Sequence, residues 1–183
     1  MKNLFKIIML TVWGFLFIAT FSNEQLLAAK PKEIIFVCTG NTCRSPMAEG
    51  IAKKFVEDNK LDYKISSRGT KIDPKEVVAN PKSIEVMKTR NIDISNHKSN
   101  MFTKEDIDNA DLILTMTDSH KKGLLELFPE AAPYTFTITE YATGKEGNIS
   151  DPWGKEIEEY IKTAEQLDIL VPQAMEQFKS TTK

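Results

Sequence analysis

The amino-acid sequence predicts an α/β fold, a three-layer doubly wound sheet of about four parallel strands flanked by helices. Three observations predict it. Short, continuous apolar runs are typical of strands buried on both faces, and they alternate with stretches of helical periodicity. This alternation indicates βαβ units with right-handed connections. The 183 residues, 41% of them hydrophobic, suffice for one domain with a sizeable core.

The first half of the chain opens this pattern. The run Glu33–Cys38 reads as a strand buried on both faces. A helix is expected to start at Pro46, with Ser45 as its N-cap, because proline suits the first helical position. A second strand is predicted over residues 64–69. A helix over 80–90 opens on the same pattern of capping residue and proline.

The second half continues the alternation. The predicted elements are a short helix over 103–108, a strand over 111–116, a helix over 119–128, a strand over 134–139 and a helix over 155–178. The last helix carries an apolar stripe of Ile157, Ile161, Ala164, Leu167, Leu170 and Val171. Pro172 is expected to kink it.

Residues 1–29 form a separate N-terminal segment, and residues 30–183 form the predicted catalytic domain. Lys2 and Lys6 precede a 15-residue uncharged run, and small residues end the segment. That order is typical of a secretory signal peptide. The run spans about 22 Å as a helix, short of a bilayer core of ~30 Å. Three interpretations stay open: a cleaved signal, an uncleaved membrane anchor, or a wrongly chosen start site or buried helix. A cytoplasmic location is the alternative to export.

Composition excludes several function classes. The net charge is -2, and only three of the 24 basic residues are arginines, which argues against nucleic-acid binding. The two cysteines are spaced C-x4-C, unlike a redox pair or a zinc knuckle, and His97 and His120 stand alone in the sequence. No metal and no cofactor is therefore predicted.

The segment Cys38–Ser45 carries the predicted chemistry. It joins a strand end, a tight loop and a helix start, where backbone N–H groups and the helix dipole bind anions. Gly40 is expected to allow a backbone conformation that other residues resist. Arg44 offers a planar fork for two phosphate oxygens, and the electropositive loop favours a Cys38 thiolate. The segment thus predicts a phosphate cradle with a nucleophile; the alternative is a buried cysteine at a strand end.

The sequence FVCTGNTCRSPMAE, with its C-x5-R-S pattern, resembles the phosphate loop of the low-molecular-weight protein tyrosine phosphatases. The resemblance runs from about Glu33 to Leu170 and includes residues 67–70, 95–97 and 110–116 and the pair Asp151-Pro152. Arg68 departs from the alanine usual in the family. We expect this change to alter the loop surface and leave the chemistry intact.

The resemblance implies a role for each matching residue. Cys38 would be the nucleophile, Arg44 the phosphate clamp and Asp151 the general acid on a mobile loop. Ser45 would donate a hydrogen bond to the Cys38 thiolate. The implied phosphate- and substrate-binding set is Thr39, Gly40, Asn41, Thr42, Cys43, Ser45 and Trp153, with Ser67 and His97 in a supporting network. The implied substrate is a phosphorylated protein, and the oligomeric state is left open.

Other readings of single residues stay open. Asp151 also suits a turn before Pro152, His97 also suits a surface loop, and Trp153 also suits core packing. Cys43 is a candidate partner for Cys38 in a reversible protective disulfide, or simply a small packed residue.

Thr42 is the residue that bears on the substrate. CTGNTCRS and the stretch from Phe136 to Gly144 resemble the bacterial protein arginine phosphatases, where the loop threonine acts as a substrate filter. Phosphotyrosine is the alternative substrate, with Thr42 merely fitting the loop. Two more distant alternatives are an arsenate reductase, which needs further cysteines that this chain lacks after Cys43, and a non-catalytic phosphate-binding module.

Overall fold

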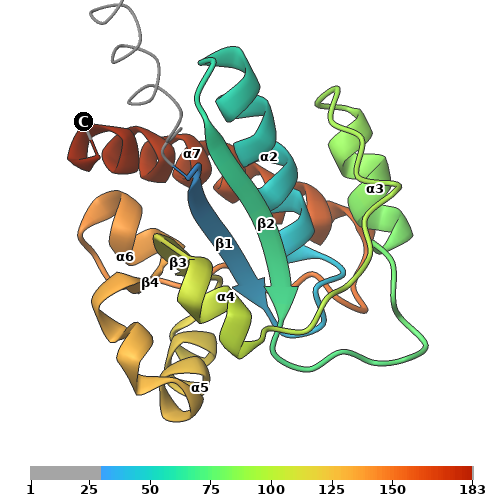
Figure 1. Cartoon of the computed structure of the whole chain (residues 1–183). Coiled ribbons are helices and arrows are strands. Elements are labelled where there is room, and N and C mark those ends of the chain that lie inside the picture. Colours follow the sequence, from blue (N-terminus) through green and yellow to red (C-terminus); the bar gives the residue numbers. More distant parts are fainter. Residues whose placement is uncertain (1–29, 183) are drawn as a thin grey trace, which may run out of the picture. The chain divides into compact units, whose positions relative to one another are not determined.

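The computed structural model describes residues 30–182, and the predicted N-terminal segment 1–29 lies outside the described residues. Four parallel strands form one sheet in the order β2-β1-β3-β4 (Figure 1). The strands are β1 (Lys32–Cys38), β2 (Tyr63–Gly69), β3 (Leu112–Thr115) and β4 (Thr135–Thr137). The predicted four-stranded parallel sheet is confirmed.

Helices cover both faces of the sheet, as the alternation of strands and helices predicts. One face packs against α2 (Arg44–Asp58), α3 (Pro81–Lys88), α6 (Ile138–Thr143) and α7 (Ile157–Thr181). The other packs against α4 (Lys104–Asn109), α5 (Asp118–Leu127) and the 3₁₀ helix η1 (Pro129–Tyr134). Strand β1 serves both cores: Ile34 and Phe36 face the first, and Ile35 and Val37 face the second, all fully buried. Three layers result.

The fourth strand is shorter than predicted. The alternation over residues 134–139 reads as a strand, but β4 ends at Thr137 and α6 begins at Ile138. The Thr137 hydroxyl accepts from the Glu140 backbone N–H, and the Glu140 carboxylate accepts from the Thr137 N–H. This capping box starts a helix and overrides the period-two pattern.

The start of α2 also differs from the prediction. The helix begins at Arg44 with Cys43 as the N-cap residue, so Ser45 lies inside the first turn. The Ser45 hydroxyl bonds to side chains of the preceding loop instead of capping the helix. The capping prediction for α3 is confirmed, because the Asn80 side chain accepts from the Lys82 N–H.

Helix α7 starts two residues later than predicted and continues through Pro172 to Thr181. Ala164, Leu167 and Val171 of the predicted stripe are fully buried. Ile161 is 38% exposed, whereas Tyr160, outside that stripe, is buried. Across residues 30–182, none of the helices combines the length and the apolar character that a membrane crossing requires.

Candidate active site

The phosphate-loop candidate, residues 38–45, lies where β1 ends at the carboxyl edge of the sheet, the edge at which such folds bind ligands. Backbone bonds fix it to the chain after β2: Thr70 N donates to Cys38 O and Lys71 N to Thr39 O, each at 3.0 Å. Gly69 permits this approach, since a Cβ there would lie 2.7 Å from Thr39 O.

The left-handed residue in this loop is Asn41, with a φ of 56°. Gly40, predicted to need an unusual conformation, has a φ outside the left-handed range. A Cβ at Gly40 would meet the Thr42 hydroxyl at 3.7 Å, an ordinary contact. The prediction for Gly40 was wrong because asparagine tolerates the left-handed region and supplies the turn itself.

Cys38 is 3% exposed, and its Sγ lies 2.9 Å from the Ser45 Oγ. Asn41 Nδ2 donates to the same Ser45 oxygen at 2.9 Å. Because the amide occupies an acceptor position on that oxygen, the hydroxyl proton can point to sulfur. The backbone oxygen of Arg68, its other acceptor, is more distant at 3.5 Å. The geometry therefore suits donation from Ser45 to a Cys38 thiolate.

Asn41 organises a network behind the loop. Its Nδ2 also donates to the Ser67 hydroxyl at 2.8 Å, and Ser67 donates to the Glu49 carboxylate. The Asn41 backbone oxygen lies 2.9 Å from His97 Nε2 and accepts from the Ser99 hydroxyl at 3.0 Å. Because a carbonyl oxygen only accepts, Nε2 is the donor in this contact, and burial is the main cause that lowers the pKa of His97. Ser67 and His97, the two residues of the implied supporting network, thus both contact Asn41.

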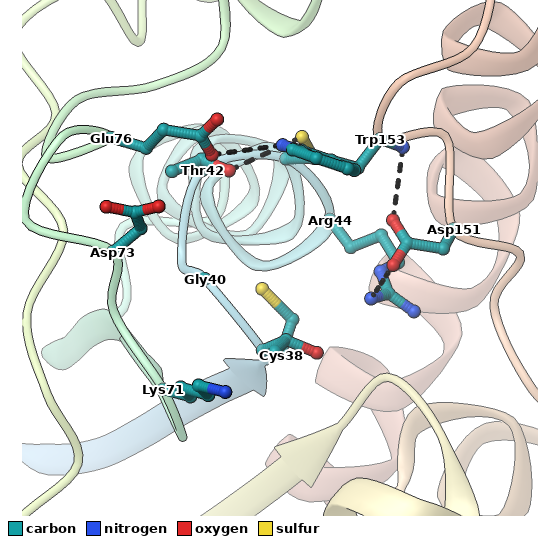
Figure 2. Close-up of a pocket in the computed structure, with 11 residues that line it drawn as sticks. Cys38, Gly40, Thr42, Arg44, Lys71, Asp73, Glu76, Asp151 and Trp153 are labelled. Carbon is teal, nitrogen blue, oxygen red and sulfur yellow. Dashed lines mark hydrogen bonds and ion pairs between the residues drawn. The ribbon is translucent and has the colours of Figure 1, made fainter.

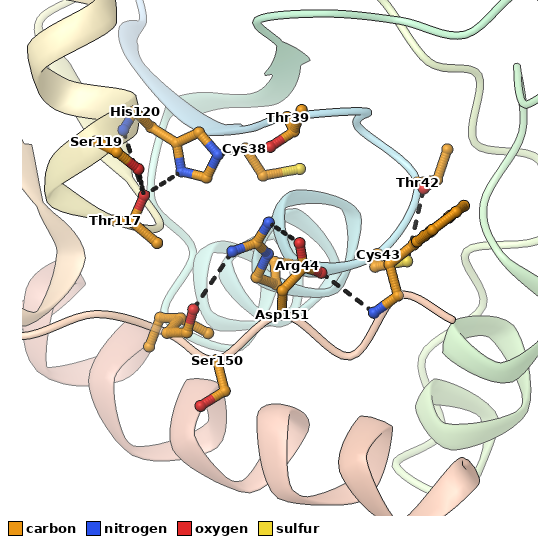
Figure 3. Close-up of polar contacts among 12 residues, drawn as sticks. Cys38, Thr39, Thr42, Cys43, Arg44, Thr117, Ser119, His120, Ser150 and Asp151 are labelled. Atoms are coloured by element: carbon orange, nitrogen blue, oxygen red, sulfur yellow. Dashed lines mark hydrogen bonds and ion pairs between the residues drawn. The ribbon is translucent and has the colours of Figure 1, made fainter. Parts of the chain in front are cut away.

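Arg44 and Asp151 form an ion pair across the site, with 2.6 Å between Nη2 and Oδ2 (Figure 3). The Arg44 side chain is 6% exposed and the Asp151 side chain is 50% exposed. The Arg44 Nε is buried without a hydrogen-bond partner among the described residues. A bound phosphoryl oxygen could satisfy this donor, because a guanidinium presents its N–H groups as a fork.

These groups meet in a cavity of about 230 Å³ (Figure 2). Its lining residues are Cys38, Thr39, Gly40, Thr42, Cys43, Arg44, Lys71, Asp73, Glu76, Asp151 and Trp153. Most of the predicted set therefore comes together. Asn41 and Ser45 do not line the cavity and act from behind the loop.

Three lining residues were not predicted from the sequence: Lys71, Asp73 and Glu76. They lie in the segment between β2 and α3, where no motif marks them. Trp153, the predicted aromatic wall, is 55% exposed, and its Nε1 donates to the Glu76 carboxylate at 3.0 Å. The alternative of core packing for Trp153 does not fit this exposure.

Cys43 shares the loop but has a different environment from Cys38. Its thiol lies 3.5 Å from the Thr42 hydroxyl and 3.9 Å from the Tyr160 hydroxyl on α7. Burial raises the pKa of the Cys43 thiol, and both cysteines are free. In the reduced protein the protonated form of Cys43 is therefore favoured.

His120 is a further site residue that sequence reasoning missed. Its ring lies between two hydroxyls, 2.8 Å from Thr39 Oγ1 and 2.7 Å from Thr117 Oγ1. Burial, followed by the charge of Arg44, lowers the pKa of His120 to about 4. The neutral ring thereby ties α5 to the phosphate loop. The one local signal was Thr117, whose hydroxyl caps α5 by accepting from the His120 N–H.

Arg68, the departure from the family pattern, does not line the cavity. Its guanidinium pairs with Asp106 at 2.9 Å and donates to the Ser67 backbone oxygen. Within residues 30–182, no three His, Cys, Asp or Glu side chains gather closely enough to hold a metal ion.

Comparisons with known proteins agree with this geometry. The family profile described as low molecular weight phosphotyrosine protein phosphatase matches residues 33–183. A protein-arginine-phosphatase of Bacillus subtilis is 40% identical over 147 residues, which cover 80% of this chain and 97% of the relative. The low molecular weight protein-tyrosine-phosphatase PtpB of Staphylococcus haemolyticus is 43% identical over 139 residues, which cover 75% of this chain and 94% of the relative.

A solved structure extends the agreement to three dimensions. The YwlE arginine phosphatase, in a mutant with a phosphorylated active-site serine, superimposes with a TM-score of 0.78 at 37% identity. The matched region covers 82% of this chain and 97% of the YwlE chain. The chain therefore belongs to the low molecular weight phosphotyrosine protein phosphatase family and is a protein phosphatase.

Proposed function

We propose that this phosphatase hydrolyses phosphoarginine in proteins through a phosphocysteine intermediate on Cys38. The observation that carries the proposal is one cavity lined by the Cys38 thiol, the Arg44 guanidinium, the Asp151 carboxylate and the Thr42 side chain. The first three provide a nucleophile, an anion clamp and a proton donor. Thr42 and Asp151 provide polar groups beside the phosphoryl site, which suit a guanidinium rich in N–H donors.

Substrate binding replaces the Arg44–Asp151 ion pair. Arg44 is almost fully buried, whereas half of Asp151 is exposed, so Asp151 is the partner free to move. The phosphoryl oxygens take the guanidinium, including its unpartnered Nε. Asp151 is thereby released from the ion pair, takes up a proton from solvent and turns toward the leaving group, on the open side of the cavity.

In the first step the Cys38 thiolate attacks phosphorus. An S–P bond forms, the P–N bond to the substrate guanidine breaks, and protonated Asp151 gives its proton to the departing nitrogen. Arg44 holds the phosphoryl oxygens as charge redistributes among them.

In the second step ionised Asp151 accepts a proton from water as the water oxygen attacks phosphorus. The S–P bond breaks and inorganic phosphate forms. The sulfur leaves as a thiolate 2.9 Å from the Ser45 hydroxyl, whose donated hydrogen bond stabilises it. When phosphate leaves, Asp151 loses this proton to solvent and pairs with Arg44 again.

Phosphotyrosine is the second candidate substrate, and the exposed Trp153 indole at the cavity favours it. An aromatic wall stacks on a phenyl ring. The same face also attracts a guanidinium through cation–π interaction, so Trp153 serves either substrate. Thr42 separates the two, since an aliphatic residue at that position would suit a phenyl ring better.

The test is kcat/KM on phosphoarginine and phosphotyrosine peptides of matched sequence, under reducing conditions, with C38S as the inactive control. T42I is expected to lower the ratio of phosphoarginine to phosphotyrosine activity about tenfold. T42S keeps the hydroxyl and is expected to preserve the ratio. A wild-type preference for phosphotyrosine would overturn the arginine proposal and leave the phosphocysteine mechanism in place.

The location of the enzyme is a separate proposal. The charge and hydropathy order of residues 1–29 supports export or membrane attachment, and a cytoplasmic location is the alternative. An exported Cys38 would meet an oxidising compartment. Fractionation of cells producing the full chain, followed by N-terminal sequencing, distinguishes cleaved, anchored and cytoplasmic forms.

A further inference from the structure

Glu76 and Trp153 lie on opposite sides of the active-site cavity and touch across its mouth (Figure 2). They are separated by 77 positions in sequence, and their contact is the hydrogen bond from the indole Nε1 to the Glu76 Oε2 at 3.0 Å. Because Trp153 is 55% exposed, core packing does not hold its ring. The Glu76 carboxylate is the side-chain hydrogen-bond partner of the indole at the mouth.

The segment that carries Glu76, residues 71–80, is hydrogen-bonded to the phosphate loop at both ends. Lys71 N donates to Thr39 O before it, and Asn80 N donates to Thr42 O after it, at 3.0 and 2.8 Å. Within the segment, the Glu76 N–H donates to Asp73 O at 2.9 Å and closes a turn. The Glu76 backbone is thus held at a defined place relative to the phosphate loop.

On the opposite side of the cavity from Glu76, Trp153 lies two residues after Asp151 in the same loop. Its backbone N–H donates to Asp151 Oδ1 at 3.1 Å. A chain of contacts therefore leads from Glu76 through the Trp153 side chain and backbone to the Asp151 carboxylate. The aromatic wall and the acid are positioned together.

The charges around the cavity add a second role. Apart from Cys38, Arg44 and Asp151, which act on the phosphoryl group itself, the charged lining residues are Lys71, Asp73 and Glu76. One ammonium against two carboxylates leaves the mouth with a net charge of -1. A negative mouth beside an aromatic face attracts a cation and repels an anion.

We propose that Glu76 determines specificity in this enzyme in two ways. Its carboxylate accepts the hydrogen bond that positions the Trp153 indole at the mouth of the cavity. It also contributes the negative charge by which the mouth selects positively charged phosphorylated segments. This rests on the proposed phosphatase function and extends it to the surroundings of the phosphorylated residue. Substrates with arginine or lysine beside the phosphorylated residue are favoured over those with aspartate or glutamate.

The test uses the full chain under reducing conditions and two phosphotyrosine peptides, one with basic and one with acidic flanking residues. The wild-type kcat/KM ratio of basic to acidic peptide exceeds one and shrinks as salt rises. E76Q keeps an oxygen acceptor for the indole, removes the charge, and lowers the ratio about fivefold. E126Q removes an exposed carboxylate on α5 outside the cavity and keeps the wild-type ratio.

W153F tests the hydrogen bond between Trp153 and Glu76, since it keeps an aromatic ring and removes the Nε1 donor. It raises KM for both peptides more than it lowers kcat and retains the basic-over-acidic ratio. If E76Q has the same basic-to-acidic ratio of kcat/KM as E126Q, the role of the Glu76 charge is overturned. If W153F has the same KM as the wild type, the positioning role of the Glu76–Trp153 hydrogen bond is overturned. A wild type inactive on phosphoarginine but sensitive to flanking charge would reject the arginine substrate and keep the role of Glu76.

Discussion

Acidification is expected to destabilise the folded chain through His120. Burial and the neighbouring Arg44 charge lower the pKa of this imidazole from 6.5 to about 4. Between these values the unfolded chain binds a proton at this position and the folded chain does not. The free energy of unfolding therefore falls as the pH falls, and the stabilisation is fully present only above pH 6.5.

The size of the effect follows from the two pKa values. A pKa of about 4 against 6.5 corresponds to roughly 3 kcal/mol once both states are protonated. About 2 kcal/mol of this loss is already reached at pH 5. Protonation is costly here because the imidazolium would lie buried beside the Arg44 guanidinium.

The assay is urea unfolding of the wild type and H120Q at several values between pH 7 and 4.5. H120Q cannot titrate at this position, and every other titrating group, including His97, is common to both proteins. The free energy of unfolding is expected to fall with acidification about 2 kcal/mol further in the wild type than in H120Q by pH 5. Equal pH slopes for the two proteins would refute the assignment of a lowered pKa to His120.

Three further predictions follow from single contacts. S45A removes the hydrogen bond to Cys38 and is expected to slow hydrolysis of the phosphocysteine about 10- to 100-fold, giving a larger pre-steady-state burst; an unchanged burst would contradict this. G69A forces a Cβ to 2.7 Å from a loop carbonyl and is expected to cost about 1–3 kcal/mol in thermal unfolding, whereas G123A, with open space on α5, is expected to stabilise by up to about 1 kcal/mol. Mild peroxide is expected to join Cys38 and Cys43, a loss of two hydrogens by mass spectrometry; only sulfinic or sulfonic Cys38 would exclude the disulfide.

Several features of the site are predictable from the sequence because they are local. The proposed nucleophile, the proposed arginine clamp and the start of α2 fall within the eight residues Cys38–Ser45, which follow a buried strand. The order of strands and helices likewise predicts a parallel sheet, and the ends of its strands gather the loops at one edge. Asp151 is more than 100 residues away, and its assignment depended on the resemblance to the family.

Local rules failed where two signals compete for the same residues. The stretch 134–139 alternates as a strand does, but the Thr137–Glu140 capping box starts a helix. Ser45 has the residue type of an N-cap, but its hydroxyl bonds to Cys38 and Asn41. In each case the side-chain hydrogen bond decides between two conformations that the sequence pattern allows.

The sequence by itself determined the fold class and the residues proposed for the phosphate loop and the nucleophile, because each depends on neighbouring residues and on periodicity. Only the tertiary structure decided which distant residues complete the site. His120 meets Thr39 across 81 positions, Asp151 meets Arg44 across 107, and Glu76 meets Trp153 across 77. No local pattern specifies such pairs, because folding of the sheet brings the connecting loops together at its carboxyl edge.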